Sequence, residues 1–154
     1  MSRILSRIGS LRTEQRAVQL LLIILIVTSL SALATTVYAE TIIQKCGGGK
    51  RVTCVVDGDT IWFQGERIRL MGYDTPELKT NICGGQKEKK LAILASTRLV
   101  EILNGQPFTI ERHGLDKYGR TLAIIRSNGR DVGEMLIKER LARSWPDGDE
   151  FWCK

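Results

Sequence analysis

The sequence has few of the residues on which many metal centres and acid–base sites depend. It contains one histidine, His113, and its four cysteines form no C-x-x-C pair, so a zinc site is not indicated. A single histidine at the end of a strand is usually a surface residue, and we expect no catalytic role for His113. The sequence also has no internal repeat and no low-complexity tract. A repeat architecture is therefore excluded.

Charged residues are absent from residues 17–39, which include the apolar run LLLIILIV at 20–27 and follow four arginines. This composition indicates a targeting segment rather than a core element. Small residues at its end suit a signal peptidase, which would cut before Glu40, whereas the uncleaved segment is long enough to span a bilayer as an anchor. In both cases the following domain would be exported, to the periplasm or the medium, and only residues 17–39 would contact a membrane.

The rest of the 154 residues is long enough for one domain, and a hydrophobic fraction of 43% supplies a core. We divide the chain into a leader, 1–39, a linker with three consecutive glycines, 40–49, and a domain, 50–154. The net charge of +6 owes much to the arginines of the leader, so the domain is only mildly basic, which suits a polyanionic substrate without requiring one. The cysteines are expected to form disulfides in an oxidising compartment, and all three pairings remain open. They are Cys46, Cys54, Cys83 and Cys153.

Short runs rich in β-branched and apolar residues, separated by turn residues, predict five strands. Apolar residues at helical spacing predict an amphipathic helix between the third and fourth strands, and Asp131 can cap a second helix after the fifth. These elements indicate an α+β fold that is mainly β, a small closed five-stranded β-barrel with two helices packed against it. We expect strands at 51–56, 60–63, 67–71, 108–112 and 121–126, and helices at 91–103 and 131–141.

Three motifs carry the candidate chemistry: VVDGDT at 55–60, RLMGYDTPE at 69–77 and DKYGR at 116–120. Each alone is typical of an ordinary turn or strand end. In this order, with a helix between the second and third, they resemble the staphylococcal nuclease (thermonuclease) family over nearly all of 51–143. The resemblance implies an SNase-like OB-fold, hydrolysis of phosphodiester bonds in DNA or RNA, and Ca²⁺ as the cofactor.

The resemblance also implies which residues hold the calcium ion. Asp59 and Asp74 would supply carboxylate oxygens and Thr75 its carbonyl oxygen, while Asp57 would lie just behind these ligands. Ca²⁺ takes about six to eight oxygen ligands, so this small set leaves positions for water and for a substrate phosphate. An open metal site of this kind suits catalysis.

The other motif residues would act on the substrate. Glu77 would hold or activate the attacking water, and Arg69 and Arg120 would bind the scissile phosphate and the charge that builds on it. Arginine suits that role because its planar guanidinium donates two parallel hydrogen bonds to a phosphate and stays charged. Lys117 and Tyr118 would contact the nucleic acid beside the cut.

Strand alternation supports the placement of Arg69. Ile68 and Leu70 share one face of the expected strand, so Arg67 and Arg69 point to the other face. Arg69 can therefore lie near Asp74. We assign Arg67 to the solvated outer face of the strand.

Two other functions compete with that of a nuclease. One is a catalytically silent module that binds nucleic acid or a protein through the same barrel, with or without a membrane tether. The other is a membrane-tethered structural element of an envelope assembly, which would leave the motif residues unexplained. A silent module is expected to lose some of the arginines and carboxylates of the motifs, and none is lost, so we favour the enzyme. We expect a monomer without a protein partner. The tyrosine that stacks on a base in the family is missing, and Trp145 can replace it.

Overall fold

The computed structural model of the chain describes residues 42–79 and 83–154. The predicted leader at 1–39, whether signal peptide or anchor, lies outside the described residues. Within the described ranges, no helix is both long enough and apolar enough to cross a membrane.

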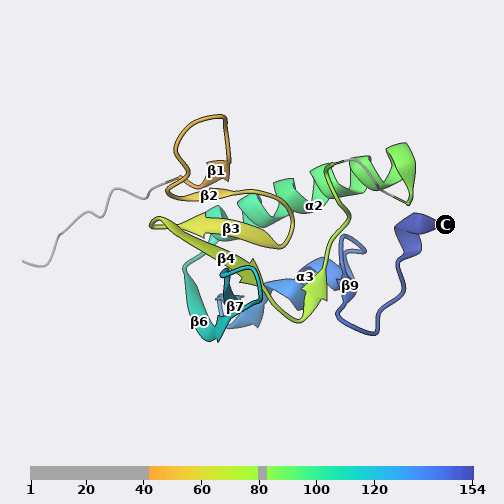
Figure 1. Ribbon diagram of the computed structural model, residues 1–154. Helices are drawn as coiled ribbons and strands as arrows, with labels where there is room; N and C mark the ends of the chain where they lie inside the picture. Colours follow the sequence, from red (N-terminus) through yellow and green to blue (C-terminus); the bar gives the residue numbers. More distant parts are fainter. Residues whose placement is uncertain (1–41, 80–82) are drawn as a thin grey trace, which may run out of the picture. The chain divides into compact units, whose positions relative to one another are not determined.

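Most of the described strands form one curled sheet, a half-barrel of the OB type (Figure 1). Its strand order is β1-β2-β3-β4-β7-β6, and β8 pairs with β7. β1 with β2 and β4 with β7 are parallel pairs, whereas the other neighbours are antiparallel. The strands are β1 (Gln44–Lys45), β2 (Cys54–Val55), β3 (Thr60–Phe63), β4 (Glu66–Leu70), β6 (Phe108–Leu115), β7 (Thr121–Ser127) and β8 (Arg130–Asp131).

A second, two-stranded sheet and two α-helices accompany the half-barrel. β5 (Tyr73–Asp74) pairs antiparallel with β9 (Arg143–Ser144). α2 (Gly85–Gly105) runs along the β1–β2 side of the curled sheet, α3 (Val132–Lys138) packs against β7, and a short 3-10 helix, η1 (Phe151–Cys153), lies near the start of α2 (Figure 1). The predicted α+β fold, with five main strands and two packed helices, is confirmed.

The hydrophobic core lies between the inner face of the curled sheet and the two helices. Ile61, Ile68 and Leu70 point inward from β3 and β4, Leu99 meets them from α2, and Leu136 from α3, all with at most 1% of their surface exposed. Burying one such side chain stabilises the fold by about 1.5–3 kcal/mol. The outer face of β4 carries Arg67, which is exposed, and Arg69, which is half-buried, as the alternation predicted.

Both helices differ in extent from the prediction. α2 begins at Gly85, ahead of the predicted start at 91. The apolar pattern does not extend into its first turns, because these are charged and only Glu88 among them is buried. α3 is capped as predicted, since Oδ1 of Asp131 accepts hydrogen bonds from the backbone N–H of the second and third helical residues at 2.8 and 3.3 Å. It ends at Lys138, short of the predicted end at 141, because Arg140 has a φ of 57°, which no α-helix continues through.

Part of the expected linker at 40–49 belongs to the fold. Ile43 is buried in the core, and its backbone N–H and C=O are both bonded by the side chain of Asn104, at 2.9 and 2.8 Å. Gln44 and Lys45 add a parallel strand to β2. Two residues are too short a run to give a periodic signal, which is why the sequence suggested a later start.

The structure selects one of the three possible cysteine pairings. Cys46 is joined to Cys54, and Cys83 to Cys153. The first disulfide closes the loop between β1 and β2, and the second joins the start of α2 to the C-terminal 3-10 helix. Trp152 of this 3-10 helix is buried, whereas Trp145 is 55% exposed.

Candidate active site

The guanidinium of Arg69 is the centre of the candidate site. Arg69 lies on the outer face of β4, and its Nη1 contacts Oδ1 of Asp59 while its Nη2 lies 3.0 Å from Oδ1 of Asp74. The side chain of Arg69 is 16% exposed, so solvent screens these ion pairs less than it screens surface pairs. The structure therefore brings together three of the residues that the sequence predicted to act in one site.

Asp59 is held by the chain segment that carries the second motif. Its Oδ2 accepts hydrogen bonds from both the backbone N–H and the hydroxyl of Thr75, each at 3.0 Å. The turn before it needs a glycine, because a Cβ on Gly58 would lie 2.6 Å from the side chain of Thr75 and 2.9 Å from that of Ala95. Close packing of the first motif against the second thus fixes the carboxylate of Asp59, which is 6% exposed.

Asp57 lies beside Asp59 and faces the arginines of the site. Its Oδ1 accepts the backbone N–H of Asp59 at 3.2 Å, which shapes the turn. Burial raises the pKa of Asp57 above its ordinary value, although the positive charges of Arg69 and Arg120 act against this shift.

Asp74 has a second cationic partner that the sequence did not indicate. Nε of Arg143 lies 3.1 Å from Oδ2 of Asp74, on the strand that pairs with β5. The same guanidinium donates to the carbonyl of Gly148 at 2.8 Å, forms an ion pair with Glu150 at 2.7 Å, and lies over the ring of Trp145. Arg143 belongs to none of the three motifs, and its position depends on a strand pair that joins residues far apart in sequence.

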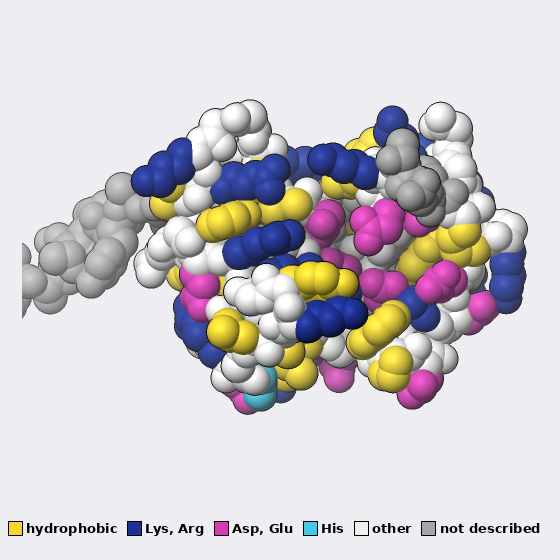
Figure 2. Space-filling model, in the orientation of Figure 1, with side chains coloured by type: hydrophobic (Ala, Val, Ile, Leu, Met, Phe, Trp, Pro, Cys, Tyr) yellow, Lys and Arg dark blue, Asp and Glu magenta, His cyan; other side chains and the backbone are white. Residues whose placement is uncertain are grey.

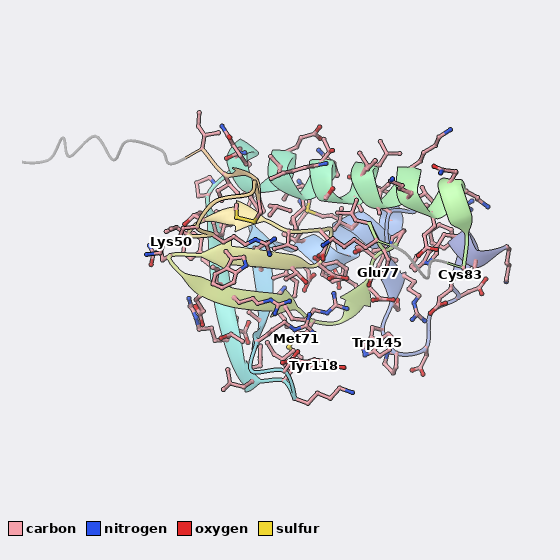
Figure 3. All side chains as sticks on the ribbon, turned by 45° about the horizontal axis from the view of Figure 1, so that its top comes forward. Lys50, Met71, Glu77, Cys83, Tyr118 and Trp145 are labelled. Carbon is pink, nitrogen blue, oxygen red and sulfur yellow. A yellow bond between two sulfur atoms is a disulfide. The ribbon has the colours of Figure 1, made fainter. Side chains whose placement is uncertain are left out.

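Glu77, the last residue of the second motif, is exposed and is labelled in Figure 3. Its pKa is raised above the ordinary value by partial burial, and also by the negative charges of Asp57 and Asp74. Its backbone N–H donates to Oε1 of Glu88 at 3.2 Å. Glu88 is a second residue that the sequence did not indicate, because a charged residue in a charged first helical turn gives no sign of being buried.

The third motif forms a turn directly before β7. Oδ1 of Asp116 accepts the backbone N–H of Tyr118 at 2.8 Å and of Arg120 at 2.9 Å, and its Oδ2 binds Nε of Arg120 at 2.7 Å. Thr121, the next residue, pairs with Ile68 in the parallel pair of β4 and β7. The backbone of Arg120 therefore lies beside β4, the strand that carries Arg69. The structure thus places Arg120 next to the site, although its bonded partner is Asp116.

Lys117 and Tyr118 occupy the exposed tip of this turn. Nζ of Lys117 lies 5.1 Å and Cζ of Arg120 lies 5.5 Å from the centre of the Tyr118 ring, which is 69% exposed. Tyr118 and Trp145 both lie below Glu77 in Figure 3. On the face shown in Figure 2, acidic side chains gather in the middle and basic side chains lie on both sides of them. His113 lies outside the candidate site. Among the described residues, its side chain is paired only with the exposed Glu111.

The residues around Arg69 fit a calcium ion by their chemistry. Asp59 and Asp74 offer carboxylate oxygens, the hard ligands that Ca²⁺ prefers, and both carboxylates already converge on a single cationic group. The carbonyl of Thr75 belongs to the same segment. Another tight group of potential ligand atoms consists of Cys83, Glu150 and Cys153, but its two cysteines are oxidised to a disulfide and offer no thiolate.

Comparison with known proteins identifies relatives of this chain. Residues 67–149 match the family described as "Staphylococcal nuclease homologue". The chain is 38% identical over 105 residues to the thermonuclease of Staphylococcus intermedius, over 63% of this chain and 61% of that protein. It is 38% identical over 96 residues to endonuclease YncB of Bacillus subtilis, over 57% of this chain and 44% of that protein. It is also 33% identical over 88 residues to the succinoglycan biosynthesis protein ExoI of Rhizobium meliloti, over 54% of this chain and 46% of that protein. The chain thus spans less than two thirds of the length of each of these relatives.

Proposed function

Because the chain belongs to the family of staphylococcal nuclease homologues, we propose that it is a nuclease that hydrolyses phosphodiester bonds of DNA or RNA with Ca²⁺ as its cofactor. Two relatives of this chain are named as a thermonuclease and an endonuclease. The observation that carries the proposal is the position of Arg69 between Asp59 and Asp74. This arrangement joins a phosphate-binding group directly to oxygen ligands for a divalent cation.

The reaction that we propose needs positive charge around an anionic phosphodiester. The N–H groups of Arg69 that contact the two carboxylates are the donors that a phosphate would take, and Arg120 lies beside them to bind another phosphate oxygen. Asp59, Asp74 and the carbonyl of Thr75 would hold Ca²⁺. When bound, the ion would add positive charge near the phosphate and make a bound water more acidic.

Glu77 is the residue that we propose for the attacking water. Its carboxylate is exposed and has no ion pair within the described residues, so it can orient a water or accept a proton from it. A general base contributes about 10²- to 10⁴-fold to a rate. Lys117 and Tyr118, at the tip of the turn before β7, would contact the nucleic acid beside the cut, and Trp145 offers an exposed ring to a base.

We further propose that the nuclease acts outside the cytoplasm. The uncharged segment at 17–39, preceded by arginines, supports export, and two disulfides in the described domain suit an oxidising compartment. The domain would act as a monomer on nucleic acid, with membrane contact limited to residues 17–39.

The experiment that tests the function uses the purified full-length chain. Single-stranded DNA, duplex DNA and RNA are incubated with it in Ca²⁺, and then with a chelator. We expect cutting of at least one substrate that stops when the chelator is added. If none is cut in Ca²⁺ but one is bound, the chain is a silent binding module and the proposal fails.

Variants separate the site from the rest of the fold. Arg69→Ala should lower the rate by about 10²-fold or more, since it removes donors to the charge that develops on the phosphate. Arg67→Ala, on the same strand but exposed, is the matched control and should cut at the ordinary rate. Calorimetry of Ca²⁺ binding tests the metal ligands without relying on activity: Asp59→Asn and Asp74→Asn should each weaken binding. Binding of unchanged strength in both variants would show the ligand assignment to be wrong.

A further inference from the structure

Glu88 is a buried carboxylate that the proposed reaction does not use. It lies in the first turn of α2 with 2% of its surface exposed. In the part of the chain that the structure describes, its bonded partners are backbone N–H groups, and no lysine or arginine pairs with it. A buried charge is costly unless its oxygens are hydrogen-bonded, so these bonds are essential to its position.

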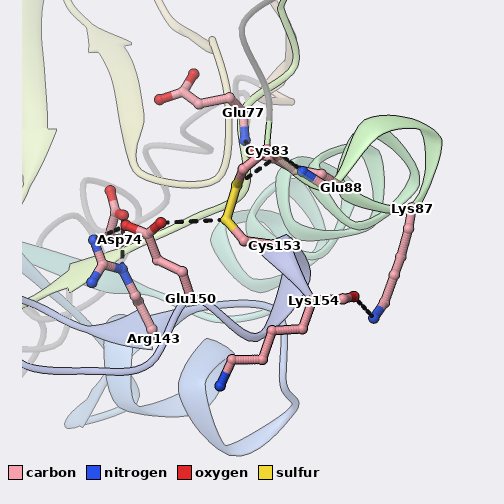
Figure 4. Close-up of a disulfide and its surroundings, with 10 residues drawn as sticks. Asp74, Glu77, Cys83, Lys87, Glu88, Arg143, Glu150, Cys153 and Lys154 are labelled. Atoms are coloured by element: carbon pink, nitrogen blue, oxygen red, sulfur yellow. Dashed lines mark hydrogen bonds and ion pairs between the residues drawn. A yellow bond between two sulfur atoms is a disulfide. The ribbon is translucent and has the colours of Figure 1, made fainter.

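The two oxygens of Glu88 bind two different segments of backbone. Oε1 accepts the N–H of Glu77 at 3.2 Å, and Oε2 accepts the N–H of Gly84 at 2.9 Å. Sγ of Cys83 also lies 3.5 Å from Oε2, but a disulfide sulfur has no hydrogen to donate, so this is a packing contact (Figure 4). A carboxylate in the first turn of a helix is further stabilised by the partial positive charge of the helix N-terminus.

Glycine is required at residue 84 for this arrangement. A Cβ on Gly84 would lie 1.9 Å from the backbone oxygen of Trp152. The backbone N–H that donates to Glu88 is therefore held between α2 and the C-terminal 3-10 helix, which the disulfide of Cys83 and Cys153 joins to the same place. One carboxylate oxygen of Glu88 is thus bonded to the fixed backbone of Gly84, and the other is bonded to the backbone of Glu77.

Glu77 has few polar bonds that fix its position. Within residues 42–79 and 83–154, its one hydrogen bond is the donation from its backbone N–H to Glu88. The residue before it, Pro76, is buried, whereas the side chain of Glu77 is exposed. The direction in which the carboxylate of Glu77 points therefore depends on the bond that Glu88 makes to its backbone.

We propose that Glu88 is a positioning residue that holds Glu77 against the start of α2 and so aims its carboxylate at the attacking water. This inference rests on the proposed function, because it takes the role of Glu77 from it. Glu88 itself does not contact the substrate or the metal site. Its removal should therefore slow the chemical step and leave the binding of substrate and Ca²⁺ nearly unchanged.

Glu88→Gln is the informative substitution. Glutamine has the same shape, but one of its terminal groups is an oxygen and the other an NH₂, which cannot accept a hydrogen bond. One of the two backbone N–H groups, of Glu77 or of Gly84, must then lose its partner. Glu101→Gln, on the exposed side of the same helix, is the matched control.

The experiment measures kcat and KM for the wild type, Glu88→Gln, Glu77→Gln and the double variant of the full-length chain, with folding checked by circular dichroism. We expect Glu88→Gln to lower kcat by about tenfold or more, within the effect of a general base, with KM changed by less than about threefold. In the Glu77→Gln background the same change should cost no further activity, because the two residues act as one unit. The control should match the wild type.

Two kinetic results would overturn the proposal. One is a folded Glu88→Gln variant with kcat within about twofold of the wild type, and the other is an equal loss in both backgrounds, which marks a merely structural role. Should Glu88→Gln fail to fold, amide hydrogen exchange of Glu77 in the wild-type chain decides the matter. Protection of that amide supports the contact, and rapid exchange overturns it. The exchange measurement does not depend on activity, so failure of the nuclease function and failure of the contact are told apart.

Discussion

Arg143 and Asp74 face one another across the β5–β9 pair, and Nε of Arg143 lies 3.1 Å from Oδ2 of Asp74. Arg69 binds the other oxygen of the same carboxylate. Asp74 is thus held between two guanidinium groups, one from the strand that carries the second motif and one from the segment that follows α3. The C-terminal part of the chain therefore contributes directly to the candidate site.

Arg143→Gln should lower both activity and stability. The side chain of Arg143 is 9% exposed and bonds Asp74, Gly148 and Glu150, so its loss removes one of the two cationic partners of Asp74 and the donor to the carbonyl of Gly148. Hydrogen bonds to charged groups are worth about 1.5–3 kcal/mol, which sets the expected loss of stability. Urea denaturation and the cleavage rate measure the two effects. Arg98→Gln removes exposed ion pairs only and serves as the control, expected within about 1 kcal/mol of the wild type. Equal losses in the two variants would contradict the prediction.

The two disulfides should differ in how much they stabilise the folded domain. Cys83 and Cys153 are 70 residues apart and Cys46 and Cys54 only 8, so the loop-entropy model gives about 4 kcal/mol for the first and about 2.5 kcal/mol for the second. The Cys83→Ser/Cys153→Ser variant should also lose activity, because the long-range disulfide lies beside both Glu88 and Glu150 (Figure 4). Denaturation and cleavage assays of the two double variants check this order. A larger loss on removing the short loop would refute it.

Stability should depend on the charge of Glu66 in a defined pH range. The guanidinium of Arg112, together with the hydroxyl of Thr121, holds the pKa of Glu66 below its ordinary value of 4.5. A carboxyl whose pKa is lowered on folding stabilises the protein above its unfolded pKa, and this contribution is lost as the pH falls through the folded value. Glu66→Gln should therefore be less stable than the wild type at pH 7, by less than about 1 kcal/mol because the pair is partly exposed.

Thermal unfolding of the wild type and Glu66→Gln at several pH values tests this dependence. The difference in melting temperature between the wild type and Glu66→Gln should shrink once the pH drops below about 4.5. A difference of the same size at pH 7 and at pH 3 would show that the charge of Glu66 is not the cause.

Asp131→Ala should destabilise the domain by about 1 kcal/mol through loss of the cap of α3. Oδ1 of Asp131 accepts two backbone N–H groups that have no partner inside the helix. Asp147→Ala, at an exposed position, is the matched control and should leave the melting temperature unchanged. Equal melting temperatures for the wild type and Asp131→Ala would mean that the cap is dispensable.

Local patterns predicted the residues of the site that lie within the motifs. The alternation of β4 placed Arg69 and Ile68 on opposite faces, and the structure has them so. Asp59 and Asp74 were expected together because of a resemblance in motif order, and both contact Arg69. Short-range periodicity is a reliable guide where a single strand or turn sets the direction of a side chain.

Arg143 and Glu88 could not be predicted in the same way. Arg143 reaches Asp74 through a strand pair whose residues are 69 positions apart, and two-residue strands have no periodic pattern. Glu88 is buried where Glu77, Gly84 and η1 meet the start of α2, whereas the other residues of its own helical turn are charged or polar and exposed. Ile43 was placed in a linker for a similar reason, because its backbone is bonded by the side chain of Asn104, 61 residues further along the chain.

The register shift in the β6–β7 hairpin lies between Arg112 and Leu115, before the turn that carries Arg120. The turn itself is closed by Asp116 through bonds to its own neighbours, so it does not depend on the length of β6. Insertions or deletions near Gly114 can then be absorbed at the bulge while β7 keeps its parallel register with β4. This hairpin is accordingly a place where the fold can vary in length without moving Arg69 and Arg120.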